Sequence, residues 1–385
     1  MNLLTAENEN SNKIMGIFLD LSKAFDTVDH DISLYKLHNY GIRGAAYNWL
    51  KSYLSDRQQF TIIGDCSSRV MPLSIGVPQG SILGPLLFLI CVNDIHHACT
   101  NADLKLFADD SNLFVIGKNL NDLYDAANLA CSQVSHWFQC NRLTVNCSKS
   151  AYILFFPNTE DDDFIKSNDL CIALDNNVIN RVYVSKFLGI LLDDKLSFKD
   201  HINSIICKIN GINSMLYRRR DYIPLNCRRS LYFALVYPRL QYGIEIYGKT
   251  TLKLLQPLNV SCNRVLRTLQ DQRMFCNVKQ LYLNFNILPI HDLYKFSVCK
   301  MIYKSLNYTG VMSSTIREIF KSLQSIRSYH TRLSNTSYLF SSANRVFFKS
   351  YVYDCVLIWN HIPIVIRNSS SLELFSKHYK SYLIN

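Results

Sequence analysis

The chain has 385 residues and 13 cysteines but contains no Cys-x-x-Cys sequence. Its cysteine and histidine residues also lack the clustered spacing of a zinc finger. The cysteines are therefore interpreted as buried, reduced thiols, which are typical of proteins inside the cell. We expect an intracellular protein, with nucleus and cytoplasm both open.

Long apolar runs are missing as well. The longest, Pro85 to Val92, is far too short to span a bilayer. The N-terminal stretch from Thr5 to Lys13 is polar, unlike a signal peptide. The sequence has no internal repeat and no low-complexity tract. We therefore expect no membrane partner.

Charge is unevenly distributed along the chain. Residues 1–180 carry 12 Lys and Arg against 20 Asp and Glu, whereas residues 181–385 carry 29 against 10. A basic half joined to an acidic half indicates a phosphate-binding surface beside a metal site. Tyrosines lie between the basic clusters, a mixture that suits nucleic-acid binding, although any single tyrosine fits core packing better. The candidate nucleic-acid-binding residues are Arg218, Arg219, Arg220, Arg228 and Arg229.

An acidic pair, Asp109-Asp110, lies between two short apolar runs, Leu104 to Ala108 and Asn112 to Ile116. Apolar strand, acidic turn and apolar strand predict a β-hairpin that presents two carboxylates at its tip. Adjacent carboxylates repel each other, and either solvent or a bound cation can compensate for the repulsion. Taken alone, the pair fits a solvated tip better than a metal site.

A second acidic position lies upstream, near the end of the apolar run from Lys13 to Leu21. This run has β character and carries Asp20. A carboxylate at the end of a buried strand would lie where the hairpin tip can meet it. Three carboxylates from two elements are enough to hold two divalent cations. The next polar residues are expected to cap and start a helix rather than bind metal: Asp26, Asp29 and His30.

A turn rich in glycine and proline separates the two acidic positions. Gly76-Val77-Pro78-Gln79-Gly80-Ser81 brings the backbone into a tight turn that a ligand can approach closely. The apolar run from Leu86 to Val92 then predicts a buried helix. The chain thus carries three blocks in order: Leu19 to Asp26, the turn from Gly76 to Ser81, and Phe107 to Asp110. Together they resemble the reverse transcriptase family, most closely the non-LTR (LINE-type) retrotransposons.

The resemblance implies a role for each matching residue. Asp20, Asp109 and Asp110 would be the catalytic ligands of two Mg²⁺ ions, with Mn²⁺ as an alternative. Phe25 would be the aromatic gate that excludes a 2′-hydroxyl from the incoming nucleotide, and an ordinary core aromatic is the competing interpretation. The other residues expected to contact the nucleotide are Pro78, Gln79 and Gly80.

Two further segments match the family less specifically. Lys149 would be the general acid for the leaving pyrophosphate, with a solvated surface lysine as the alternative. The apolar segment from Phe187 to Asp193 resembles the primer grip, whose glycine would allow close approach to the 3′ end of the primer. The expected primer-grip residues are Phe187, Leu188 and Gly189.

The resemblance also implies an α+β fold. It would be a polymerase right-hand palm, an antiparallel sheet with helices, followed by a mainly helical thumb and C-terminal region. We expect a partial palm over residues 13–200, a thumb-like helical region over 201–250 and a helical region of unknown role over 251–385. Apolar spacing predicts a helix from Leu120 to Cys140, and Asn158 to Asp163 is expected to be an acidic loop.

The implied function is an RNA-directed DNA polymerase acting on an RNA template, a DNA primer and deoxynucleoside triphosphates. Only 19 residues precede Asp20, where family members have a long fingers region, so we expect a C-terminal piece of a longer reading frame. Two alternatives stay open. One is a catalytically inactive remnant that binds nucleic acid, and the other is a structural protein. Binding through phosphates would weaken steeply as salt rises, which distinguishes the two.

Overall fold

The computed structural model describes residues 12–175, 177–273, 275–308, 310 and 351–384. The chain divides into two compact units. The first, here called the sheet unit, comprises Asn10–Gly189 and Asp193–Lys195. The second, called the helical unit, comprises Ile190–Leu192 and the residues from Leu196 onward. The fold is α+β, as expected.

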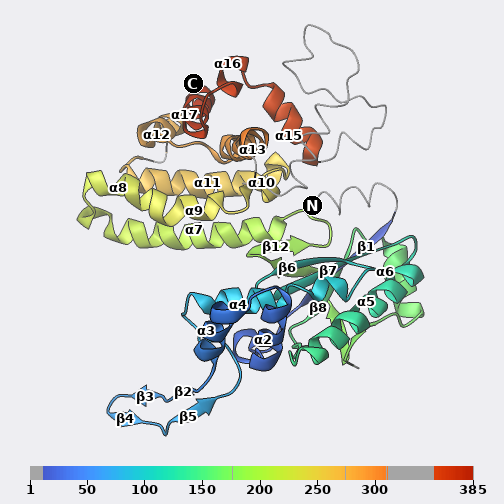
Figure 1. Ribbon diagram of the computed structural model, residues 1–385. Helices are drawn as coiled ribbons and strands as arrows, with labels where there is room; N and C mark the ends of the chain where they lie inside the picture. The colour runs from blue at the N-terminus through green and yellow to red at the C-terminus, as the bar shows by residue number, and fades with distance from the viewer. Residues whose placement is uncertain (1–11, 176, 274, 309, 311–350, 385) are drawn as a thin grey trace. The chain divides into compact units, whose positions relative to one another are not determined.

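A six-stranded sheet organises the sheet unit, with the strand order β6-β7-β1-β8-β10-β9 (Figure 1). Neighbouring strands are antiparallel except β8 and β10, which are parallel. β1 lies between β7 and β8, so its apolar residues are buried on both faces, which explains the uninterrupted hydrophobic run. The strands are β1 (Lys13–Leu19), β6 (Asp103–Phe107), β7 (Asp110–Gly117), β8 (Ala151–Phe155), β9 (Ile172–Leu174) and β10 (Asn177–Arg181).

Helices cover this sheet. The longest, α5 (Leu120–Cys140), has the predicted bounds and packs against β7, β9 and β1. Its cap, Asn119, accepts a hydrogen bond of 2.8 Å from the backbone N–H of Asp122. The remaining helices of this unit are η1 (Ala24–Asp26), α2 (His30–Asn39), α3 (Gly44–Leu54), α4 (Leu83–Val92), η2 (Ile95–His97) and α6 (Thr159–Ser167).

The segment expected to be an acidic loop begins a helix instead. Asn158 caps α6 by accepting from the backbone N–H of Asp161, and the Asp161 carboxylate accepts from the backbone N–H of Asn158. This reciprocal pair is a capping box. Acidic side chains in the first turn also interact favourably with the helix dipole. The prediction of a loop was wrong because these residues supply the hydrogen bonds and the negative charges that stabilise the N-terminus of a helix.

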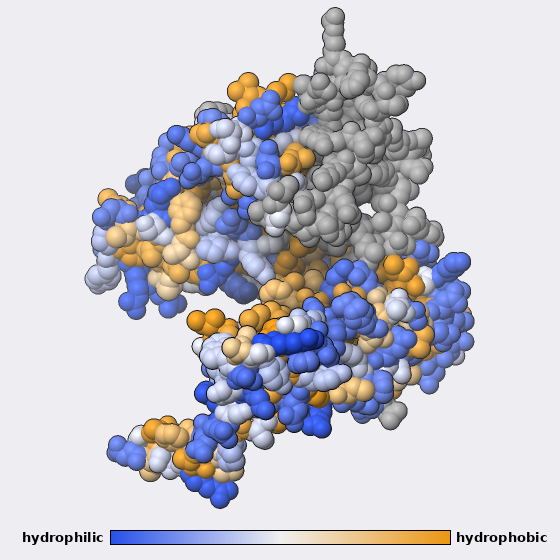
Figure 2. Space-filling view, viewed as in Figure 1, coloured by the Kyte–Doolittle hydropathy of each residue, from blue (hydrophilic) through white to orange (hydrophobic). Residues whose placement is uncertain are grey.

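An arm of two small sheets lies between α3 and α4 and projects from the rest of the sheet unit (Figure 1). Its strands are β2 (Arg57–Gln59), β3 (Ile62–Ile63), β4 (Cys66–Ser67) and β5 (Met71–Leu73), with β2 paired to β5 and β3 to β4. Apolar side chains are exposed along the arm, including Phe60, Ile62 and Ile63 (Figure 2).

The helical unit is built on α7 (Lys199–Arg219), which packs along α11 (Leu252–Leu269). The expected boundary between residues 250 and 251 is therefore not a break between compact units. Residues 311–350 of the expected third region lie outside the described part of the chain. The other elements are β12 (Ile190–Asp193), η3 (Arg220–Tyr222), α8 (Leu225–Leu231), the π-helix Tyr232–Val236, α9 (Tyr237–Gln241), α10 (Ile244–Tyr247), α12 (Val278–Phe285), α13 (Ile290–Asn307), α15 (Tyr351–Asn360), α16 (Ile364–Arg367) and α17 (Leu372–Ile384).

Aromatic side chains hold the last helices together. The rings of Tyr303 and Phe375 stack at 4.5 Å, and Phe375 also contacts Trp359 and Tyr379. All four side chains are buried, so they form a core between α13, α15 and α17. Among the described residues, no helix combines the length and apolar character needed to cross a membrane.

All 13 cysteines are free. Six of them are buried and five are exposed, so the expectation of buried thiols holds for only part of the set.

Candidate active site

Two neighbouring strands bring the acidic positions together. β1 and β7 are antiparallel, and their register pairs Leu19 with Ser111. One step further along each strand, Asp20 therefore lies opposite Asp110. Asp109 occupies the turn between β6 and β7, directly after Ala108, which has a left-handed backbone with φ of 51°. The predicted hairpin is confirmed, and all three carboxylates lie at one end of the sheet.

Asp20 is fixed through its backbone. Its N–H donates to the hydroxyl of Ser150 at 3.2 Å, and its carbonyl accepts from the N–H of Asn146 at 2.7 Å. Ser150 is buried and donates in turn to the carbonyl of Asn146 at 2.9 Å. The turn from Asn146 to Ser150 thus clamps the main chain of Asp20 and leaves its carboxylate available to a ligand.

The three carboxylates influence one another electrostatically. Partial desolvation raises the pKa of the Asp110 carboxyl group, and the negative charges of Asp109 and Asp20 raise it further. The ammonium group of Lys186 acts in the opposite direction. The position of Lys186 on β11 (Val184–Phe187) carries no sequence signal that marks it as part of this site.

The donor set fits divalent cations. Carboxylate oxygens are the ligands that Mg²⁺ and Mn²⁺ prefer, and a bound cation would relieve the repulsion that raises the pKa of Asp110. In the described part of the chain, no three His, Cys, Asp or Glu side chains already converge into a metal site. A cation would thus have to draw these carboxylates together.

Lys149 lies beside the first carboxylate, with its Nζ 3.8 Å from Oδ2 of Asp20. Both side chains are substantially exposed, so this pair contributes little to stability. Lys149 follows Asn146 in the turn that clamps Asp20, which explains why it reaches the acidic end of the sheet.

Phe25 and the glycine-rich turn form the second part of the site. Phe25 is half-buried in η1, and its ring lies 4.8 Å from that of Phe88 on α4. Pro78 is half-buried, whereas Gln79 and Gly80 are exposed. Two backbone hydrogen bonds join this turn to the segment that contains Phe25: Val77 N–H to Phe25 O and Gly76 N–H to Val28 O.

Among the expected primer-grip residues, Phe187 ends β11, and Leu188 and Gly189 follow it. The Phe187 ring packs 6.2 Å from Phe18 and 6.3 Å from Phe114, on one face of the large sheet. Leu188 and Gly189 have φ of 46° and 83°, so the chain turns sharply there. Strand alternation places Asp20 on the same side of β1 as Phe18, which is the side on which the Phe187 ring packs.

The five candidate arginines of the helical unit differ in their surroundings. Arg218 and Arg219 are exposed, the guanidinium group of Arg220 lies 4.5 Å from the Tyr217 ring, and Arg229 donates to the carbonyl of Phe285. Arg228 is buried, unlike its neighbours. Its guanidinium group donates to the carboxylate of Asp271 and to the backbone carbonyls of Ile223, Leu269 and Arg220. Arg228 is therefore a structural residue and cannot present its charge to phosphate.

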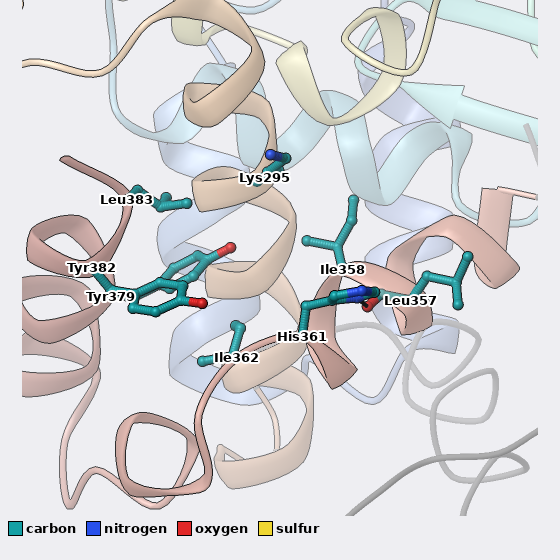
Figure 3. A pocket seen from close by; sticks show the side chains of 8 residues that line it. All are labelled: Lys295, Leu357, Ile358, His361, Ile362, Tyr379, Tyr382 and Leu383. Carbon is teal, nitrogen blue, oxygen red and sulfur yellow. Dashed lines mark hydrogen bonds between the residues drawn. The ribbon is translucent and has the colours of Figure 1, made fainter. Parts of the chain in front are cut away.

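A separate pocket of about 350 Å³ lies in the helical unit (Figure 3). Tyr379, Tyr382 and Leu383 come from α17, Leu357 and Ile358 from α15, and Lys295 from α13. His361 and Ile362 complete the lining. No carboxylate is among these described lining residues.

Comparison with known families agrees with this geometry. Residues 2–192 match the model described as "Reverse transcriptase (RNA-dependent DNA polymerase)". These residues belong to the reverse transcriptase family. The matched range contains the carboxylates, Phe25, the glycine-rich turn, Lys149 and the residues from Phe187 to Gly189. The resemblance seen in the three sequence blocks is thereby confirmed.

Named relatives of this reverse transcriptase domain are mobile-element proteins. The chain is 26% identical over 297 residues to the RNA-directed DNA polymerase from mobile element jockey of Drosophila melanogaster, covering 74% of this chain and 31% of that protein. It is 27% identical over 286 residues to the probable RNA-directed DNA polymerase from transposon BS of the same species, covering 72% and 31%. The chain thus spans about a third of the length of these relatives.

Two other matches are more distant. The Pol polyprotein from retrotransposable element R2 of Popillia japonica is 24% identical over 280 residues, covering 68% of this chain and 43% of that protein. A telomerase structure from Candida albicans, in complex with a fragment of telomeric RNA, covers 84% of this chain and 52% of that chain. Its TM-score is 0.27 at 12% identity, so it supports no conclusion about this fold.

Proposed function

We propose that the chain is the RNA-directed DNA polymerase part of a non-LTR retrotransposon protein, extending a DNA primer on an RNA template. The observation that carries this proposal is the β1–β7 register, which gathers Asp20 and Asp110 at the strand ends next to Asp109. The family match over residues 2–192 supports it. In this proposal the sheet unit is the palm, and the region that begins with α7 is the thumb.

Asp20, Asp109 and Asp110 would hold two divalent cations through carboxylate oxygens. When bound, the cations would lower the pKa of the primer 3′-hydroxyl and neutralise the charge of the leaving pyrophosphate. The backbone clamp on Asp20 would keep the first ligand in place before substrate arrives. Preorganisation of this kind reduces the cost of assembling the site during reaction.

Other side chains would select and orient the substrates. Lys149 is placed beside Asp20, where its ammonium group could deliver a proton to the leaving pyrophosphate. Phe25 would exclude a 2′-hydroxyl from the incoming nucleotide, and the exposed Gln79 would contact that nucleotide together with Pro78 and Gly80. Phe187, Leu188 and Gly189 would hold the 3′ end of the primer.

Exposed and half-buried basic residues of the helical unit would bind the phosphate backbone. Arg218, Arg219, Arg220 and Arg229 remain in this proposed set, and Arg228 leaves it because its donors are occupied within the protein. Tyr217 and Tyr222 are exposed near them and could stack on bases. An intracellular location, nuclear or cytoplasmic, belongs to the same proposal and is supported by the free cysteines.

The test is deoxynucleotide incorporation on a primed RNA template in the presence of Mg²⁺. The Asp109→Ala, Asp110→Ala double variant is compared with the unchanged chain, and Asp125→Asn serves as a control because Asp125 is an exposed carboxylate on α5. We expect incorporation by the unchanged chain and the control, and none by the double variant. Salt-sensitive RNA binding without incorporation by any variant would instead support an inactive remnant.

A further inference from the structure

Two segments of the sheet unit, about fifty residues apart in sequence, are held together by side chains as well as by backbone. The amide nitrogen of Gln79 donates to Oδ1 of Asp26 at 2.7 Å. At the start of the same turn, Nε2 of His30 lies 2.7 Å from the carbonyl oxygen of Gly76. The carbonyl can only accept, so the His30 ring donates from Nε2. Both ends of the Gly76–Gln79 turn are thus anchored to the segment that follows Phe25.

The chemistry of Asp26 sets the orientation of the Gln79 side chain. An ionised carboxylate has no proton to donate, so only the NH₂ group of the Gln79 amide can face it. The carbonyl oxygen of that amide then points away from Asp26. Without Asp26, the amide could rotate by half a turn and exchange its donor and acceptor positions. Asp26 therefore determines which hydrogen-bonding group Gln79 offers to a ligand.

The close approach of the two segments leaves little room for adjustment. Gly76 has φ of +86°, and a Cβ atom at this position would lie 2.7 Å from the carbonyl oxygen of Asp26. Only glycine accommodates both the left-handed backbone and this contact. The turn therefore stands in a fixed relation to Asp26 and its neighbour Phe25.

The Asp26–Gln79 hydrogen bond is unsuited to a purely structural role. Both side chains are exposed, and exposed polar contacts add little to folding stability. Backbone hydrogen bonds and the Gly76 contact already hold the turn in place. What the carboxylate adds is the direction of one amide group.

We infer that Asp26 is a positioning residue for nucleotide selection, acting through the Gln79 amide. This inference rests on the proposed function, in which Gln79 contacts the incoming nucleotide. Asp26 directly follows Phe25 in η1, so the hydrogen bond from Gln79 reaches the immediate neighbour of the proposed sugar gate. Losing the bond weakens deoxynucleotide binding and relaxes discrimination against ribonucleotides, while the three metal-ligand carboxylates stay unchanged.

The experiment is a double-mutant cycle on the full chain with Asp26→Ala, Gln79→Ala and the double variant. The affinity for a fluorescent deoxynucleoside triphosphate is measured on an RNA template whose primer ends in a dideoxynucleotide. This primer lacks a 3′-hydroxyl, so the triphosphate can bind but is not incorporated. Steady-state incorporation with an ordinary primer then gives kcat and KM for both sugars. Asp31→Asn is the matched control, since Asp31 is an exposed carboxylate at the start of α2. Thermal unfolding checks that each variant is folded.

We expect Asp26→Ala to weaken nucleotide affinity about tenfold, because a misdirected Gln79 amide would lose about one hydrogen bond to the charged nucleotide. The double variant should bind no more weakly than Gln79→Ala, because Asp26 acts only through that amide. Additive effects, or a lower kcat with unchanged KM and discrimination, would overturn the inference. If the unchanged chain binds nucleotide but does not incorporate it, the polymerase proposal is refuted. The inference about Asp26 can still be tested, since the affinity cycle measures the coupling between Asp26 and Gln79. No nucleotide binding by the unchanged chain would overturn both.

Discussion

Replacing Asp110 by asparagine should stabilise the metal-free protein while abolishing polymerisation. Desolvation and the charges of Asp109 and Asp20 raise the pKa of Asp110 in the folded state. A carboxyl group with a raised folded pKa costs stability wherever it is ionised in both states. The cost is absent below the unfolded pKa of about 3.9, grows as pH rises through the folded value, and is complete at neutral pH.

The size of the effect is limited by solvent. Asp110 is exposed, so solvent screens its repulsion from Asp109 and Asp20. We therefore expect Asp110→Asn to raise the free energy of unfolding by about 0.2–1 kcal/mol at pH 7. For a unit of this size, about 1 kcal/mol corresponds to roughly 2–4 °C in Tm. Asp110→Asn should therefore raise Tm by up to about 4 °C in the presence of a chelator.

Mg²⁺ should reverse the order of stability. A cation that binds only the folded state adds RT ln(1 + [Mg²⁺]/Kd), which is about 1.4 kcal/mol at ten times Kd. The unchanged chain should gain this increment, whereas Asp110→Asn, with one ligand oxygen replaced by an amide, should gain much less. Thermal unfolding with and without Mg²⁺ at pH 7 and pH 5 measures both effects.

The control for this prediction is Asp125→Asn, which removes an exposed carboxylate from α5. It should change neither Tm nor the response to Mg²⁺. A lower Tm for metal-free Asp110→Asn would show that the carboxylate is stabilising and would refute the repulsion argument. An equal response of the variant and the unchanged chain to Mg²⁺ would refute the assignment of Asp110 as a ligand.

Three other substitutions, a comparison variant at Gly80 and one pH dependence test particular contacts. Gly76→Ala should lower the free energy of unfolding by about 2 kcal/mol or more in chemical denaturation, because it combines φ of +86° with a backbone clash. Gly80 has φ of +82° but lies in open space, so Gly80→Ala should lower it by only about 1–2 kcal/mol. Lys149→Met should lower kcat for incorporation about 100-fold with a smaller change in KM. Arg228→Gln should destabilise the fold by about 3 kcal/mol, measured by urea unfolding, because the largely buried guanidinium group bridges Asp271 and three carbonyls. Burial lowers the pKa of His201, so stability should fall as pH drops below about 6.5, and His201→Phe should flatten this dependence in thermal unfolding.

Local patterns predicted the elements that form the acidic end of the sheet. The hairpin around Asp109-Asp110 and the strand before Asp20 were recognisable because apolar runs stop at carboxylates. The helix from Leu120 to Cys140 was predicted with its observed bounds because its buried positions recur at steps of three and four. These signals depend only on neighbours in sequence. The same signals suggested that Asp20 and the hairpin tip could meet, but the β1–β7 register that brings them together is given only by the structure.

Two predictions were wrong because a local pattern was interpreted without the groups that its residues contact. Asn158 to Asp163 looked like an acidic loop, although the capping box between Asn158 and Asp161 was visible in the sequence. Arg228 looked like part of a solvated basic cluster, because its acceptors are carbonyls and a carboxylate up to 43 positions away. The Asp26–Gln79 bond joins residues 53 positions apart. Such pairs depend on loop conformations that tertiary packing decides.

The acidic residues near the site differ in the groups that surround them. This difference separates a structural carboxylate, Asp29, from a candidate metal ligand, Asp110. Asp29 caps α2 by accepting from the Ile32 N–H at 3.0 Å and pairs with Arg142 at 2.6 Å. Burial alone would raise the pKa of Asp29, but these two partners outweigh it and hold the pKa below its usual value. The pKa of Asp110 is shifted in the opposite direction, because partial desolvation and then the charges of Asp109 and Asp20 outweigh the single opposing charge of Lys186. The fold neutralises Asp29 with its own groups yet leaves Asp110 facing like charges, which supports the proposal that Asp110 is a ligand of an external cation.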